Sequence, residues 1–151
     1  AMSRACIGAG SYHKSQVSSH RVECNFERID EAIAMATMYT ANHCNIRAII
    51  SLTESGATPL WMSRIRTAIP IYALSRHVQT LAKVTLYRGV YPIQFDVTQF
   101  TRDEINRAAI DCLELHCDLE KGDQVILTKG DHMGVGGGAN AMKILVVGQV
   151  L

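Results

Sequence analysis

The chain has 151 residues, a length typical of a single domain. Hydrophobic residues make up 48% of it and charged residues 19%, a composition that supports a buried core and excludes a disordered chain. The formal net charge of +1 argues against a nucleic-acid-binding protein, which needs a clustered basic surface. No apolar run approaches the roughly 20 residues that span a bilayer, so we expect no membrane partner.

The start of the chain and the cysteines indicate the setting of the protein. Residues 1–25 carry glycines and serines without a sustained apolar period, and we interpret them as an extended arm. The five cysteines lack the spacing of a disulfide framework, and no signal-peptide core precedes them. We therefore expect free thiols and a cytoplasmic protein.

The predicted elements follow one another with short connections. Apolar residues over 27–42 recur at helical spacing, and the β-branched run 46–52 is typical of a buried parallel strand. Thr58 and Pro59 are expected to cap and begin a helix that ends near Thr67. The remaining predictions, in chain order, are strand 71–74, helix 78–86, strand 90–95, helix 102–117 and strands 124–128 and 141–148.

This alternation predicts an α/β layered fold, with a mainly parallel sheet of about five strands and helices on both faces. The last two strands have no helix between them, so the final strand should lie antiparallel at an edge. The inward-facing residues expected in and just after helix 102–117 are Ile105, Ala108, Ala109, Cys112, Leu115 and Leu119.

Ligands bind open α/β sheets outside the carboxyl ends of the strands, which selects segments 53–58, 75–77 and 129–138. The first is the best candidate, because its hydroxyl and amide groups meet the positive end of a helix dipole, which suits a phosphate. The alternative is an ordinary turn in which Thr58 only caps the helix. Glu54 opposes the phosphate interpretation by charge repulsion, unless it points away or forms a salt bridge.

The glycine-rich segment 130–138 has two interpretations. Gly134, Gly136 and Ala139 match a loose dinucleotide fingerprint, which we reject because a strand rather than a helix follows. The segment is either a loop that closes over a bound ligand with an anion nest of backbone amides, or a plain hairpin connection.

We predict no metal site and no catalytic residue in the chain. Cys112, His116 and Cys117 lie on one predicted helix without a fourth ligand nearby, whereas structural zinc needs four. No paired catalytic carboxylates, nucleophile elbow or P-loop is apparent in the sequence.

Several segments closely resemble the C-terminal domain of pyruvate kinases: Leu52–Gly56, Pro70–Arg76, Leu86–Pro92, the Lys121–Asp123 turn and the ending around Asn140. Ser75–His77 together with Ile29–Ala36 is similar to the enterobacterial, AMP-activated type in particular. The resemblance covers residues 5–150 in unbroken order. It implies that residues 26–151 form this domain and that residues 1–25 are the remnant of a connection to an absent catalytic barrel.

The resemblance also implies a function. The family transfers phosphate from phosphoenolpyruvate to ADP in glycolysis, with Mg²⁺ and K⁺, in a barrel that this chain lacks, so the chain alone is expected to be inactive. Its C-terminal domain binds a phosphorylated activator and contributes to a homotetramer. The expected partners are therefore the catalytic barrel, a second copy of the chain and a small effector.

Carried over residue by residue, the family's phosphate-binding loop falls on Thr53, Ser55, Gly56 and Thr58. Its effector loop falls on 130–138, with the glycines Gly130, Gly134, Gly136, Gly137 and Gly138. Some members activated by fructose bisphosphate have lysine where Glu54 stands, and Arg102 and Arg107 are merely near the place of a second-phosphate arginine. A monophosphate, AMP or ribose 5-phosphate, is therefore expected.

The last strand is the predicted interface between copies. Ile144, Leu145, Val146 and Val147 are apolar in a row, and such an edge strand would pair with its copy about a two-fold axis. The alternative position for the strand is inside the sheet, beneath helix 27–42. Two other functions stay open: an assembly domain that binds no effector, and a stand-alone α/β enzyme acting on a sugar phosphate.

Overall fold

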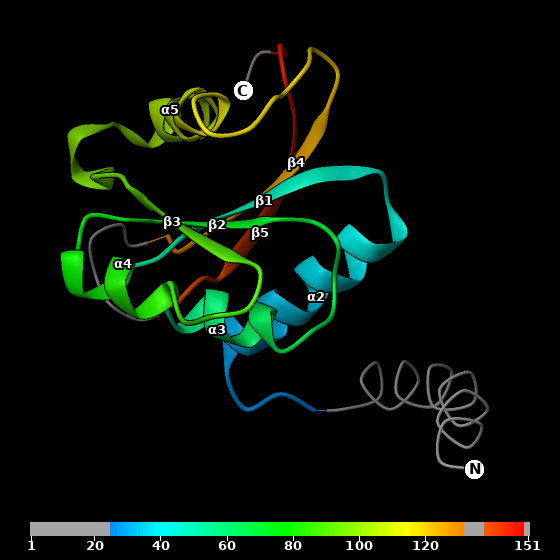
Figure 1. Ribbon diagram of the computed structural model, residues 1–151, viewed down its shortest axis with the longest axis vertical. Helices are drawn as coiled ribbons and strands as arrows, with labels where there is room; N and C mark the ends of the chain where they lie inside the picture. Colours follow the sequence, from blue (N-terminus) through cyan, green and yellow to red (C-terminus); the bar gives the residue numbers. More distant parts are fainter. Residues whose placement is uncertain (1–24, 132–137, 150–151) are drawn as a thin grey trace.

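A computed structural model describes residues 25–131 and 138–149 of the chain (Figure 1). Five strands form one sheet in the order β3-β2-β1-β4-β5. The strands are β1 (Ile46–Leu52), β2 (Ile71–Ser75), β3 (Val90–Gln94), β4 (Gln124–Lys129) and β5 (Ala141–Val146). The helices are α2 (Ile29–His43), α3 (Ala57–Ser63), α4 (Val78–Val84) and α5 (Arg102–Glu114), with a short 3₁₀ turn η1 (Val97–Gln99) before α5.

The pairing of the strands confirms the predicted fold class. Strands β1 to β4 run parallel, and β5 pairs with β4 in the antiparallel direction at the edge of the sheet. The alternative of an internal last strand is therefore wrong. None of the helices in the described part of the chain is long and apolar enough to cross a membrane.

Two cores lie on opposite faces of the sheet, as Figure 1 shows for α5 on one side and α2, α3 and α4 on the other. Strand β1 serves both, because successive side chains of a strand point to opposite faces. Ile49 packs with Met38 of α2 and Met62 of α3, while Ile50 packs with Leu113 of α5. This double burial explains why β1 is almost continuously apolar.

Three helices end earlier than predicted, for one physical reason. After α3, α4 and α5 the amide of a residue bonds to the carbonyl three positions back, as in Ile65 to Met62, Tyr87 to Val84 and His116 to Leu113. These bonds tighten the last turn, so the helical period of 3.6 residues no longer holds beyond it. The prediction that Leu115 faces inward is consequently wrong: it is 83% exposed.

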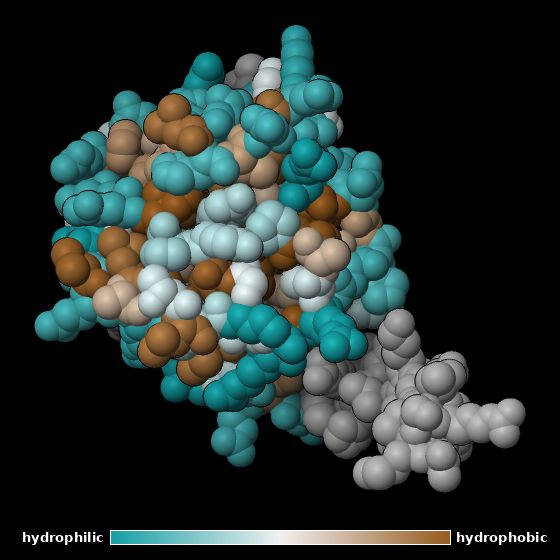
Figure 2. All heavy atoms as spheres, viewed as in Figure 1, coloured by the Kyte–Doolittle hydropathy of each residue, from teal (hydrophilic) through white to brown (hydrophobic). Residues whose placement is uncertain are grey.

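The outer surface leaves some large apolar side chains in contact with solvent. On the face in Figure 2, apolar residues form small separate groups between hydrophilic ones. On α2 the exposed ones include Ile29 and Tyr39, and the buried face is formed by residues such as Ala34, Met38 and Ala41. Scattered groups of this size are ordinary on a globular domain.

Candidate functional site

The sheet has its topological switch point between β1 and β4. The chain leaves β1 towards β2 and β3 on one side, and β4 lies on the other. Beneath this point two buried hydroxyls meet, where Thr128 Oγ1 donates to Ser51 Oγ at 3.3 Å. The loops that follow β1 and β4 lie at the carboxyl ends of these strands, outside which ligands of such folds bind.

The β1–α3 loop is a tight turn held by its own hydroxyls. Thr53 Oγ1 accepts the amide of Gly56 at 2.8 Å, and Ser55 Oγ accepts the amide of Ala57 at 3.3 Å. Gly56 is the N-cap of α3 with φ 82°, and a Cβ there would meet Val84 Cγ1 of α4 at 3.3 Å. Two of the amides expected to face a phosphate are thus already bonded, and an anion would have to share them.

The sequence-based role of Thr58 as N-cap is wrong, because Gly56 occupies that position and α3 begins at Ala57. A left-handed glycine turns the chain directly from strand to helix, which leaves Thr58 within the first turn. Thr58 is only 1% exposed, and its Oγ1 accepts the amide of Ala139 at 3.3 Å. It therefore joins the first of the predicted binding segments to Ala139, the residue directly after segment 129–138.

The base of the β4–β5 connection is fixed by a reciprocal pair. The Asp131 amide donates to Asn140 Oδ1, and Asn140 Nδ2 donates to Asp131 Oδ2, both at 3.1 Å. Arg102 of α5 adds a bond from Nη2 to the Asp131 carbonyl at 2.7 Å. Of the predicted loop glycines, Gly130 and Gly138 belong to this base, and Gly134, Gly136 and Gly137 lie outside the described residues.

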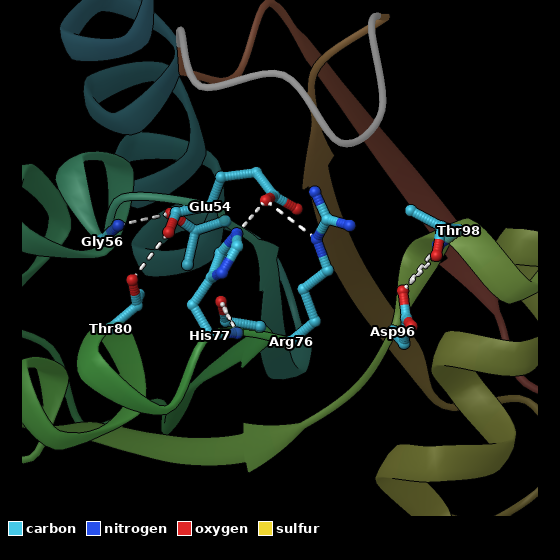
Figure 3. A network of polar contacts seen from close by, with 9 residues as sticks. Glu54, Gly56, Arg76, His77, Thr80, Asp96 and Thr98 are labelled. Atoms are coloured by element: carbon cyan, nitrogen blue, oxygen red, sulfur yellow. Dashed lines mark hydrogen bonds and ion pairs between the residues drawn. The ribbon is translucent and has the colours of Figure 1, made fainter.

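Glu54 forms a salt bridge with neighbouring basic residues, which reduces the repulsion that its carboxylate would exert on a phosphate. Figure 3 shows its carboxylate between His77 and Arg76, with Oε2 2.5 Å from His77 Nε2 and 3.2 Å from Arg76 Nε. Leu52 and Leu74 are register partners, so the residues two positions beyond them come level with each other. The cross-strand register therefore decides that Glu54 meets Arg76.

Two side chains of helix α4 donate hydrogen bonds to backbone carbonyls of the same loop. Thr80 Oγ1 donates to the Glu54 carbonyl at 2.6 Å, and Lys83 Nζ donates to the Ser55 carbonyl at 3.2 Å.

Hydrogen bonds from Thr98 lower the pKa of Asp96 at the end of β3, and the positive charge of Arg76 acts in the same direction. Basic groups from the β2–α4 region thus surround a hydroxyl-rich loop.

The sequence indicated segment 75–77 as a binding segment, but it did not predict the contacts that Thr80 and Lys83 make with the β1–α3 loop. Thr80 and Lys83 were missed because nothing in the local sequence of a short helix reveals which loop it faces. Arg107 is exposed on α5, and Arg102 bonds to the base of the β4–β5 connection.

Of Cys112, His116 and Cys117, which were predicted to share one helix, only Cys112 lies in α5, and the other two follow its end. Cys112 and Cys117 are half-buried free thiols packed against the core under α5, and burial raises the pKa of the Cys112 thiol. The His116 ring bonds through Nδ1 to the Cys112 carbonyl at 3.0 Å. Across residues 25–131 and 138–149 no three His, Cys, Asp or Glu side chains group closely enough to hold a metal ion.

The four residues of the predicted interface differ in accessibility. Leu145 and Val147 are buried in the core under α5, Val146 is half-buried, and Ile144 is 44% exposed. Only Ile144 and part of Val146 are therefore available to a partner along the β5 edge.

Comparison with known proteins gives consistent matches over most of the chain. The family described as "Pyruvate kinase, alpha/beta domain" matches residues 31–145. The chain is 45% identical over 150 residues to "Pyruvate kinase II" of Salmonella typhimurium, with 97% of this chain and 31% of that protein covered. It is 47% identical over 147 residues to a pyruvate kinase of Buchnera aphidicola subsp. Baizongia pistaciae, covering 97% and 30%.

A more distant relative has the same extent. A pyruvate kinase of Eimeria tenella is 33% identical over 149 residues, which cover 97% of this chain and 28% of that protein. The chain thus spans about a third of the length of the relatives it matches. The α/β sheet with its antiparallel edge strand agrees with the matched domain, and the chain belongs to the pyruvate kinase alpha/beta domain family.

Proposed function

We propose that this chain is the regulatory and assembly domain of a pyruvate kinase, and that it binds a phosphorylated effector at the β1–α3 loop. The observation that carries the proposal is the position of this loop at the switch point of the sheet. There Arg76, His77 and Lys83 all contact the loop, and Thr53 and Ser55 supply hydroxyls. Hydroxyls and nearby basic groups are what a phosphate monoester requires.

The effector we favour carries a single phosphate, as AMP and ribose 5-phosphate do. Glu54 accepts bonds from both Arg76 and His77, so much of the positive charge beside the loop is already balanced. A second phosphate would meet the carboxylate as well as the cations, which costs electrostatic energy.

Calorimetric titration of the chain with AMP, ribose 5-phosphate and fructose 1,6-bisphosphate tests this function. We expect one site, with tighter binding of the monophosphates and loss of binding in Ser55→Ala. The matched control is Ser63→Ala, at the far end of α3, where the hydroxyl donates to the Leu60 carbonyl. Equal affinity of the two variants would place the ligand elsewhere, and turnover of a ligand would favour a stand-alone enzyme.

Assembly through β5 is the second part of the proposal. The other sheet edge, β3, contains Pro92, which lacks an amide donor and so blunts strand pairing. The β5 edge has no proline and exposes Ile144. Pairing of β5 with β5 of a second copy would satisfy the unpaired N–H and C=O groups of this edge, and such an isologous contact is compatible with a two-fold axis.

Sedimentation velocity at micromolar concentration tests the assembly. We expect a dimer that dissociates on Ile144→Lys but persists with Leu115→Lys, a control that changes an exposed leucine on the α5 side. Lysines at Leu145 or Val147 are unsuitable, because both side chains are buried. A monomeric parent chain, or a dimer unaffected by Ile144→Lys, contradicts this interface.

The activity of the longer protein is also proposed: transfer of phosphate from phosphoenolpyruvate to ADP in the cytoplasm. Mg²⁺ and K⁺ would be held by the catalytic barrel, as the family resemblance implies. The barrel is then a partner of this domain within the same protein.

A further inference from the structure

His77 links the β1–α3 loop to α4, and binding of the proposed effector requires these two elements to be correctly positioned. It is the residue immediately before α4, and its amide bonds to Ser75 Oγ at 3.2 Å. Its ring reaches Glu54 in the β1–α3 loop (Figure 3). His77 thus connects the start of α4 to the loop that contains Thr53 and Ser55.

The charged groups of the network around Glu54 and Arg76 come from four elements. Glu54 belongs to the β1–α3 loop, Arg76 to the end of β2, Lys83 to α4 and Asp96 to the end of β3. Imidazole is the side-chain type whose charge ordinarily changes near neutral pH. The net charge of the trio Glu54, Arg76 and His77 is zero with a neutral imidazole and +1 with a protonated one.

We propose that His77 is a positioning residue of the effector site, and that its protonation through Glu54 makes anion affinity depend on pH. This inference rests on the proposed function of the β1–α3 loop. When the imidazolium pairs with Glu54, the carboxylate is held by two cations and repels an incoming dianion least. When the imidazole is neutral, it still can donate a hydrogen bond, but the carboxylate is balanced by Arg76 alone.

The sign of the effect follows from linkage. A protonated His77 favours the anion, so affinity should be higher at acid pH and fall as the solution becomes neutral to alkaline. The coupling should lie at the low end of common values, about fivefold, because the His77 side chain is 47% exposed and therefore partly screened.

The test must separate His77 from the ligand, because a phosphate monoester itself titrates at about pH 6. Inorganic sulfate keeps its two charges over this range and is the probe, with AMP as a competitor to show that both occupy one site. Sulfate affinity is measured between about pH 5.5 and pH 8 for the full chain, for His77→Gln and for His43→Gln. Glutamine keeps an uncharged donor at position 77, and His43 ends α2 just before β1, at the other end of that strand from Glu54.

The expected result is an affinity loss of about fivefold in the parent chain and in His43→Gln, and of less than about twofold in His77→Gln. Circular dichroism establishes that the variants keep the fold. The same pH dependence in His77→Gln as in the parent overturns the role of His77 and leaves the proposed function standing. Failure of both sulfate and AMP to bind the parent chain at any pH overturns the proposed function and this inference with it.

Discussion

Among the glycines in the described part of the chain, Gly138 should tolerate alanine least. Its φ of 85° lies in the left-handed region, and a Cβ would come within 2.6 Å of Asp30 Cβ and 2.9 Å of Asp30 Cγ and Oδ2. Asp30 cannot move aside easily, because it is 3% exposed and both carboxylate oxygens accept from Arg28 at 2.9 Å. The substitution therefore forces a backbone strain and a steric clash at once.

The two costs can be estimated separately. A left-handed conformation costs an alanine about 1–2 kcal/mol. Overpacking of a tight site adds about 1–3 kcal/mol. Gly89→Ala is the matched control, since Gly89 has a φ of 72° and an added Cβ there would meet no atom within 4 Å, so only the first cost applies. The free energy of unfolding should thus fall by about 2–5 kcal/mol for Gly138→Ala and by about 1–2 kcal/mol for Gly89→Ala.

Urea denaturation followed by circular dichroism measures both variants against the parent chain. A lower midpoint at an unchanged slope reports lost stability rather than a change in the surface exposed on unfolding. The difference between the two variants isolates the contact with Asp30. Equal losses in the two variants would refute the reasoning, because they would mean that the Gly138 region relaxes freely away from α2.

Three further predictions concern stability and activity. Hydrogen bonds from Arg28 lower the pKa of Asp30 below its usual 3.8. The contribution of Asp30 to stability is therefore complete above about pH 4 and is lost as pH falls through the folded-state pKa. Asp30→Asn should be less stable than the parent chain at neutral pH, and its unfolding midpoint should change less with pH below about pH 4. In the capping box of α5 the Thr101 side chain accepts the Glu104 amide, and the Thr101 amide donates to Glu104 Oε2 at 3.0 Å. Thr101→Ala removes the first of these bonds, so its thermal melts should show a loss of about 1 kcal/mol, and an unchanged melting temperature would mean that the side-chain cap contributes nothing. Mixed with phosphoenolpyruvate, ADP, Mg²⁺ and K⁺, the chain should yield no pyruvate in a coupled assay, and turnover above the blank in protein free of host kinase would contradict the expectation that the chain alone is inactive.

The sequence alone was sufficient for the order and type of the elements. Hydrophobic period and turn residues are local properties, so the strands from Ile46, Ile71, Val90, Gln124 and Ala141 could be predicted with nearly the observed bounds. The missing helix between the last two strands was enough to predict the antiparallel edge. The family resemblance of residues such as Leu52–Gly56 also required no coordinates, and the family match confirms it.

The tertiary structure decided what the local pattern does not contain. The register of β1 on β2 brings Glu54 level with Arg76, and the docking of α4 brings Thr80 and Lys83 to the same loop. The bond from Ala139 to Thr58 spans 81 positions of the chain. Such contacts depend on strand register and on which helix face is buried, and both are set by packing over the whole sheet. Packing under α5 likewise places Leu145 in the core, whereas Leu115, just beyond the last turn of α5, is exposed.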